Sequence, residues 1–139
     1  NIVERRGGLE YVGRIIGLLD HPDDDTKRYA IVALARLKDP TAVARLGRIL
    51  QKRGHGLRII AAAHLGSMGD PAALPFLASV LDDDDIRVRG AAAVAMGRLT
   101  GNDWKFHARR GPLPVLEDGV QAARAWWEEH KGEFQSVGE

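Results

Sequence analysis

Hydrophobic positions along this chain recur at spacings of three and four residues, which is the period of an amphipathic helix. The pattern is interrupted at regular intervals: the dipeptide Asp39-Pro40 returns 31 residues later as Asp70-Pro71. Aligning the chain on this offset, the repeat register, gives three units: residues 9–39, 40–70 and 71–101. The sequence therefore predicts an all-α superhelix, or solenoid, of three helical hairpins.

The start and stop signals agree with these units. Asp39 and Asp70 are suited to cap the next helix, and the proline after each occupies the first helical position, where its missing N–H costs nothing. Within the units, breaks fall at proline, glycine and aspartate clusters. The expected helices are residues 9–20, 24–38, 40–52, 56–69, 71–81 and 85–100.

The chain outside the repeats divides into a short N-terminal segment, residues 1–8, and a C-terminal part, residues 102–139. The latter begins with a loop and continues as one more helix from Glu117 to Lys131, which Gly132 is placed to end. A solenoid needs a terminal element over its last apolar face, so we expect this helix to be a cap.

Trp126 and Trp127 are the structural side chains expected in that cap. Adjacent residues lie about 100° apart on a helix, so one ring should be buried and the other partly exposed. The alternative interpretation makes the outer ring, or Trp104 in the preceding loop, an anchor for a partner.

The second helix of the third unit, from Val88 to Leu99, reads Val-Arg-Gly-Ala-Ala-Ala-Val-Ala-Met-Gly-Arg-Leu and resembles the second-helix signature of HEAT repeats. The short period resembles the bacterial type, which includes the phycobilisome-lyase-like branch. This resemblance covers residues 9–101. The second unit departs from the pattern, because its turn is Gly54-His55-Gly56 and a small core position holds His64.

Candidate catalytic and metal-binding residues are few. There is no cysteine, and no two histidines stand four residues apart on one helix face. HEAT-like deoxyhypusine hydroxylases carry His-Glu pairs in their second helices, where this chain has Arg28-Tyr29, Ile59-Ile60 and Gly90-Ala91. We expect no metal, no cofactor and no catalysis.

Two features of the repeats receive structural interpretations. His64 lies among small apolar residues, so we expect it to be buried and to make at least one hydrogen bond. The acidic run Asp82 to Asp85 is interpreted as helix capping, because aspartate suits helix N-termini and no EF-hand spacing is present.

Charge is unevenly distributed although the net charge is only +1. The second unit has no acidic residue from Pro40 to Gly69. Arg45, Arg48 and Lys52 are spaced so that they lie on one side of its first helix, the outer layer in HEAT-like stacks. This stripe is either a solvated face or a contact for an acidic protein or a phosphate backbone. The protein is favoured, because one stripe neutralises few phosphates.

The resemblance implies that second helices line the concave face, at a position where glutamate is common. This chain has Val32, Ala63 and Val94 there, with Ile59 nearby. Such an apolar patch is typical of an interaction site. Either the loop 102–116 folds across it or another chain docks, and we favour a partner, a second copy included.

The sequence therefore predicts a non-catalytic protein-binding or scaffold module. One alternative is an accessory domain resembling the phycobilisome-lyase-like HEAT proteins, which attach bilins, and another is nucleic-acid binding through the second unit. No apolar run approaches the ~20 residues of a membrane span, so no membrane role is expected. The chain begins at Asn1, which indicates a trimmed or processed N-terminus and leaves the compartment open.

Overall fold

The computed structural model describes residues 2–104 and 114–135. Within these ranges the chain forms seven α-helices and one short 3-10 helix, η1, and no strand, which confirms the predicted all-α fold. The elements are α1 (Ile2–Leu18), α2 (Asp24–Leu37), α3 (Pro40–Gln51), α4 (Arg58–Met68), η1 (Pro71–Ala73), α5 (Leu74–Ala78), α6 (Ile86–Thr100) and α7 (Pro114–Gln135).

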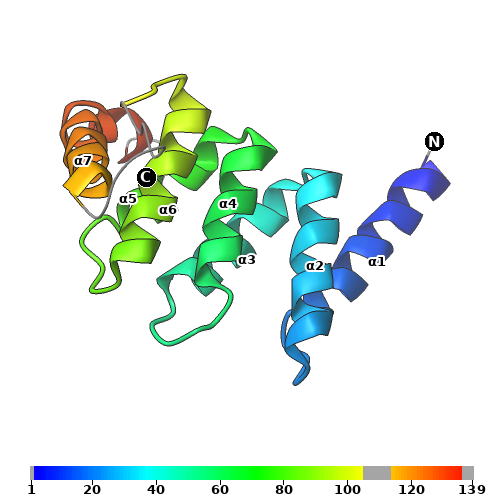
Figure 1. Cartoon of the computed structure of the whole chain (residues 1–139). Helices are drawn as coiled ribbons and strands as arrows, with labels where there is room; N and C mark the ends of the chain where they lie inside the picture. The colour runs from blue at the N-terminus through cyan, green and yellow to red at the C-terminus, as the bar shows by residue number, and fades with distance from the viewer. Residues whose placement is uncertain (1, 105–113, 136–139) are drawn as a thin grey trace.

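The helices are arranged as a stack of pairs (Figure 1). Helices α2, α4 and α6 lie side by side in chain order, while α3 and α5 pack behind α4 and α6. Helix α7 lies at the C-terminal end, against α5 and α6. None of the described helices is both long and apolar enough to cross a membrane.

One continuous hydrophobic core runs through the stack, from Ile15 of α1 and Leu19, which directly follows this helix, to Val120 and Ala123 of α7. The repeat register explains its continuity, because equivalent positions of successive second helices are buried in turn. Leu34, Leu65 and Met96 occupy one such position, and all three have no exposed surface.

Aspartates cap the starts of α2, α3, η1 and α6, as the sequence predicts. The side chains of Asp23 and Asp85 accept hydrogen bonds from backbone N–H groups at the starts of α2 and α6, and Asp39 and Asp70 do the same for α3 and η1. Among the second helices of the three units α4 is the exception, because Gly54, with a φ of +79°, stands at the register position of Asp23 and Asp85. It has no side-chain cap and begins at Arg58, two residues later than predicted.

Several other boundaries differ from the predicted ones. Helix α1 includes residues 2–8, which were expected to form a separate segment. The first helix of the third unit is split, because Pro75 has no N–H to donate to the carbonyl of Pro71, and Leu74 donates to it instead. Helix α7 continues through Gly132, across which the rings of Trp127 and Phe134 stack 5.5 Å apart. Glycine permits a helix to end but does not force it.

Candidate protein-binding surface

An apolar groove of about 380 Å³ opens between α4 and α6. It is lined by Ile59, Ala63, Arg87, Gly90, Ala91, Val94, Ala95 and Arg98. The side chains of Ile59 and Val94 are 39% and 38% exposed, unlike most large apolar residues of these helices. Exposed aliphatic side chains along a groove are typical of an interaction site.

Small residues explain why the two helices lie so close. A Cβ added to Gly66 of α4 would be 2.9 Å from the Cα of Ala95 in α6, which is shorter than real contacts allow. The backbones can meet at this crossing only because Gly66 has no side chain. Alanine and glycine make up half of the groove lining, as Ala63, Gly90, Ala91 and Ala95, and the other half is Ile59, Arg87, Val94 and Arg98.

The residues predicted for partner binding fall on more than one surface. Ile59, Ala63 and Val94 meet in the groove. Val32 of α2 is half-buried and does not line it. The basic residues Arg45, Arg48 and Lys52 line a smaller pocket beside α3.

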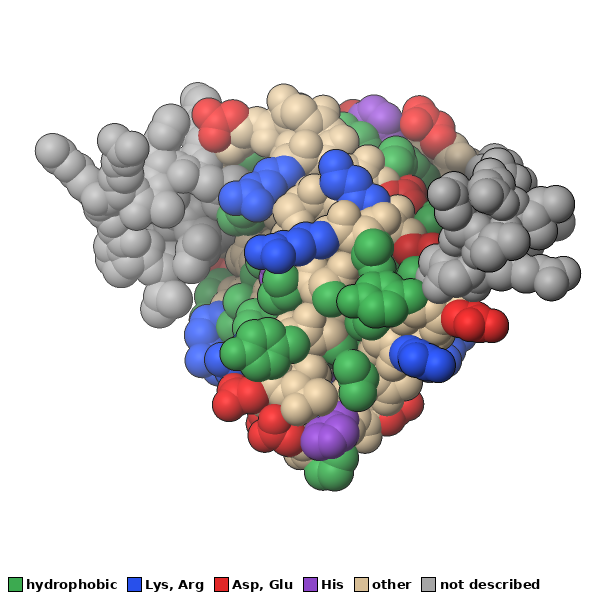
Figure 2. All heavy atoms as spheres, turned by 90° about the vertical axis from the view of Figure 1, so that its right-hand side faces the viewer, with side chains coloured by type: hydrophobic (Ala, Val, Ile, Leu, Met, Phe, Trp, Pro, Cys, Tyr) green, Lys and Arg blue, Asp and Glu red, His purple; other side chains and the backbone are tan. Residues whose placement is uncertain are grey.

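A further apolar surface lies at the N-terminal end of the stack (Figure 2). Hydrophobic side chains are exposed there between Lys and Arg side chains. Among the residues of α1 and α2 whose exposure the structure describes, the large exposed apolar ones are Tyr11, Leu18, Tyr29 and Leu37. At the opposite end, by contrast, α7 covers the apolar faces of α5 and α6.

Trp104 packs against α6 and is half-buried. A Cβ on Gly97 would lie 3.5 Å from its ring and 2.7 Å from the carbonyl oxygen of Asn102, so Gly97 allows the chain to return this closely. The backbone of Trp104 has a φ of +36°. Residues 105–113 of the expected loop, and therefore any path of that loop across the concave face, lie outside the described residues.

The cap is centred on Val120 and Ala123, which are fully buried. Trp126 and Trp127 are both half-buried against the core, so the structure does not divide them into one buried and one exposed ring as expected. Trp126 stacks on His130 with ring centroids 4.1 Å apart.

His64 also differs from its expected role. It is half-buried, and its ring makes no hydrogen bond to any described residue; only its backbone carbonyl accepts one, from Ser67. Partial burial lowers the pKa of His64, because the imidazolium form is harder to desolvate than the neutral ring. With one side open to solvent, the ring has no need of a protein partner.

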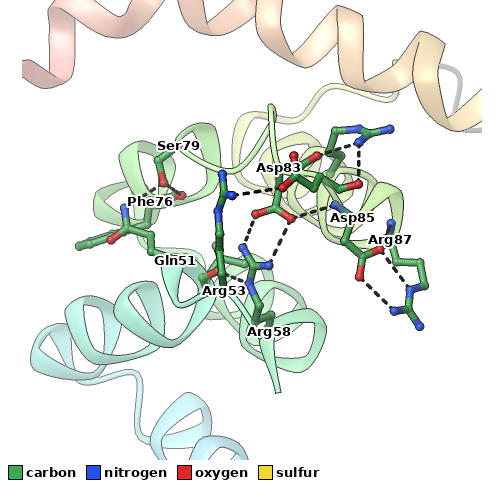
Figure 3. Close-up of polar contacts among 11 residues, drawn as sticks. Gln51, Arg53, Arg58, Phe76, Ser79, Asp83, Asp85 and Arg87 are labelled. Carbon is green, nitrogen blue, oxygen red and sulfur yellow. Dashed lines mark hydrogen bonds and ion pairs between the residues drawn. The ribbon is translucent and has the colours of Figure 1, made fainter. Parts of the chain in front are cut away.

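A buried ion pair joins the second and third units (Figure 3). Arg58, at the start of α4, donates from Nη1 and Nη2 to both carboxylate oxygens of Asp83, with 3.2 Å from Nη1 to Oδ1. Its Nε donates to the carbonyl of Leu50 at 2.7 Å. Both charged side chains are buried. The hydrogen bonds from Arg58 hold the pKa of the Asp83 carboxyl below its ordinary value.

Weaker polar contacts surround this pair. Arg53 Nη1 lies 3.1 Å from Asp84 Oδ2, and Gln51 Nε2 donates to Ser79 Oγ at 2.9 Å. In Figure 3, Arg53 and Arg58 extend from the second unit toward the same turn of the third. These contacts span the junction, so the turn before α6 is fixed to the unit that precedes it.

Sequence reasoning missed the Arg58–Asp83 pair, although the repeat register contains a signal for it. Lys27, Arg58 and Arg89 occupy one register position near the starts of α2, α4 and α6. Arg89 pairs with Glu117 of α7, so it too reaches the next element of the stack. A basic residue recurring at one helical position indicates a repeated contact.

Comparison with known proteins also identifies repeats in this chain. A family model described as HEAT repeats matches residues 13–97 and, in a second match, residues 55–126, which together exceed half of the chain. The chain is also 26% identical over 107 residues to the uncharacterized phycocyanin operon protein Z of Pseudanabaena tenuis (strain PCC 7409). The match covers 77% of this chain and 50% of that relative, so the chain spans about half the relative's length.

Proposed function

We propose, from the premise that this chain belongs to the HEAT-repeat family, that it is a non-catalytic module which binds a partner protein through the groove between α4 and α6. Stacked helical repeats commonly use their extended surfaces for binding. The observation that carries the proposal is the groove itself, where Ile59 and Val94 remain exposed although the surrounding core is closed.

The chemistry of the groove indicates what it binds. Arg87 forms an ion pair with Asp85, at 3.0 Å between Nη2 and Oδ2, so its charge is partly neutralised within the chain. The remaining lining is mainly aliphatic. A partner would therefore contribute one or two large apolar side chains, which the groove removes from water.

The test is a selection of peptides from a random library on the full chain, followed by titration of single peptides. We expect the selected peptides to carry a large apolar residue. The variant Val94→Glu should weaken them about tenfold or more, equivalent to ~1.4 kcal/mol, because it introduces a charge into an apolar contact.

The matched control is Tyr29→Glu, which makes the same kind of change at a more exposed apolar residue of α2, outside the groove. It should leave the affinities unchanged, and both variants should melt like the parent. Peptides that depend on Tyr29 and not on Val94 would move the binding site to the N-terminal end of the stack. A second copy as partner would show as dimerisation in sedimentation that Val94→Glu abolishes.

A second candidate function is an accessory role in phycocyanin assembly, and it is supported by the name of the relative. The test is co-expression with a bilin and a phycocyanin subunit. Bilin attached to the subunit only when this chain is present would support the role, and equal colour without the chain would rule it out.

A further inference from the structure

Each unit has a basic residue at one register position, as Lys27, Arg58 or Arg89. Arg58 and Arg89 each form an ion pair with an acidic residue of the next element of the stack, whereas Lys27 does not. Arg58 is paired with Asp83 of the following unit, and Arg89 with Glu117 of the cap. For Lys27, the register position of Asp83 in the following unit is occupied by Lys52. The junction between the first and second units thus places a cation where the next junction has a carboxylate.

Lys27 is a largely covered cation with a weak partner. Its side chain is only 20% exposed, and its ammonium lies 3.5 Å from an oxygen of Asp24, whose side chain is 75% exposed. Burial lowers the pKa of His55, and the charges of Lys27 and Lys52 lower it further. Both ammonium groups therefore act on one imidazole, in the turn between α3 and α4.

A pocket of about 150 Å³ opens beside this turn. It is lined by the basic side chains of Arg45, Arg48 and Lys52, by His55 and by the carboxylate of Asp20, together with two apolar residues. The three basic side chains are exposed, and none forms an ion pair with another residue in the described ranges. The pocket has three cations against one carboxylate.

We propose that this pocket, the junction pocket, binds a carboxylate of an acidic segment in a partner protein. The inference rests on the proposed binding function but uses a different surface from the groove. The partner's carboxylate would lie near Lys52, Arg48 and Arg45, at the junction where Lys52 stands at the register position of Asp83. Charge-assisted hydrogen bonds from arginine favour a planar carboxylate at such a place.

A protein carboxylate fits the junction pocket better than a nucleic-acid backbone. Affinity for nucleic acid grows with the number of phosphates neutralised, and three cations on one helix and its C-terminal turn reach few of them. Asp20 lines the pocket and Asp24 is exposed near Lys27, so closely spaced phosphates would meet negative charge on both sides. One or two carboxylates on a flexible segment can avoid these positions.

The probe is a fluorescent hexaglutamate peptide, titrated against the full chain by anisotropy at low ionic strength, where the Debye length is about 30 Å at ~10 mM salt. We expect Lys52→Asp to weaken binding about tenfold or more. The variant should remain folded, with a melting temperature no lower than the parent's, because the new carboxylate restores the partner of Lys27. The matched control, Arg36→Asp, makes the same charge change on the exposed side of α2, outside the pocket. It should weaken binding clearly less than Lys52→Asp does, because its charge lies outside the pocket.

Equal losses in the two variants would overturn the proposal, because only net charge would then matter. Tighter binding of an oligothymidylate of similar charge, with the same dependence on Lys52, would replace it with a nucleic-acid site. Val94→Glu distinguishes this inference from the groove. If Lys52→Asp weakens hexaglutamate binding but Val94→Glu leaves the affinity of the selected peptides unchanged, only the groove proposal fails. If Val94→Glu weakens the selected peptides but Lys52→Asp leaves hexaglutamate binding unchanged, only the junction-pocket proposal fails.

Discussion

The junction between the second and third units and the junction between the first and second share one repeat register but are held together differently. At the former, Gly66 and Ala95 let the helix backbones meet. At the latter, the same register positions hold Ala35 and His64. A larger residue at the crossing requires a wider separation or a displaced side chain, and His64 remains half-exposed.

The polar contacts also differ between the two junctions. The second and third units share the buried pair of Arg58 and Asp83. Among the described residues, no ion pair joins the first unit to the second, and Lys27 pairs only within α2. Two residues of the second unit that differ in type from their equivalents in the third unit, Lys52 and His64, thus both lie on the side of the second unit that faces the first.

The difference shows how a solenoid can specialise one interface without losing its fold. Each repeat contacts mainly its neighbours, so its stability is close to a sum of interface terms. A unit can therefore keep a strong contact on one side and change the other. In this chain the changed side carries the basic residues of the junction pocket.

Arg58→Ala should have the largest effect on this comparison. It leaves the buried carboxylate of Asp83 without its partner, and such a change typically costs about 3–5 kcal/mol. Lys27→Ala, at the same register position, should cost no more than about 1 kcal/mol. Urea unfolding of both variants measures the difference, and equal losses would show that the two junctions are equally strong.

Gly66→Ala should have the next largest effect. The added Cβ would collide with the backbone of Ala95, and overpacking costs about 1–3 kcal/mol, of which better helix propensity returns at most about 1 kcal/mol. Gly17→Ala is the control, because a Cβ at that exposed position of α1 meets nothing within 4 Å. It should be neutral or stabilising in thermal melts, whereas a neutral Gly66→Ala would mean that the crossing can relax.

Lys52→Asp should stabilise the weaker junction slightly. It places a carboxylate at the register position of Asp83, where Lys27 can reach it, and a partly exposed pair contributes up to about 1 kcal/mol. The gain in chemical denaturation should disappear in the double variant with Lys27→Ala. A gain that persists there would come from net charge instead.

The smallest effect concerns pH. The folded protein lowers the pKa of His64 below its ordinary 6.5, so the unfolded chain binds more protons in this range. Stability is therefore present above about pH 6.5 and falls as the pH drops through that value. Melting temperatures should decrease from about pH 7.5 to about pH 5.5, and less so in His64→Ala. The decrease should not vanish, because burial lowers the pKa of His55 in the same direction.

The sequence by itself determined the helices, their order and most of the core, because amphipathic period and capping residues act locally. The recurrence at Leu34, Leu65 and Met96 predicts buried positions, and all three are buried. It also identified Ile59, Ala63 and Val94 as neighbours on one surface, since the repeat register carries each helix onto the next.

Only the tertiary structure decided how the repeats meet. The pair of Arg58 and Asp83 joins residues 25 positions apart, and its burial depends on how α4 and the following turn are placed. The half-burial of both Trp126 and Trp127 likewise depends on the seating of α7 around Val120. Local patterns show which face of a helix is apolar, but the depth of a side chain and the partner of a charge are set by the distance and angle between helices.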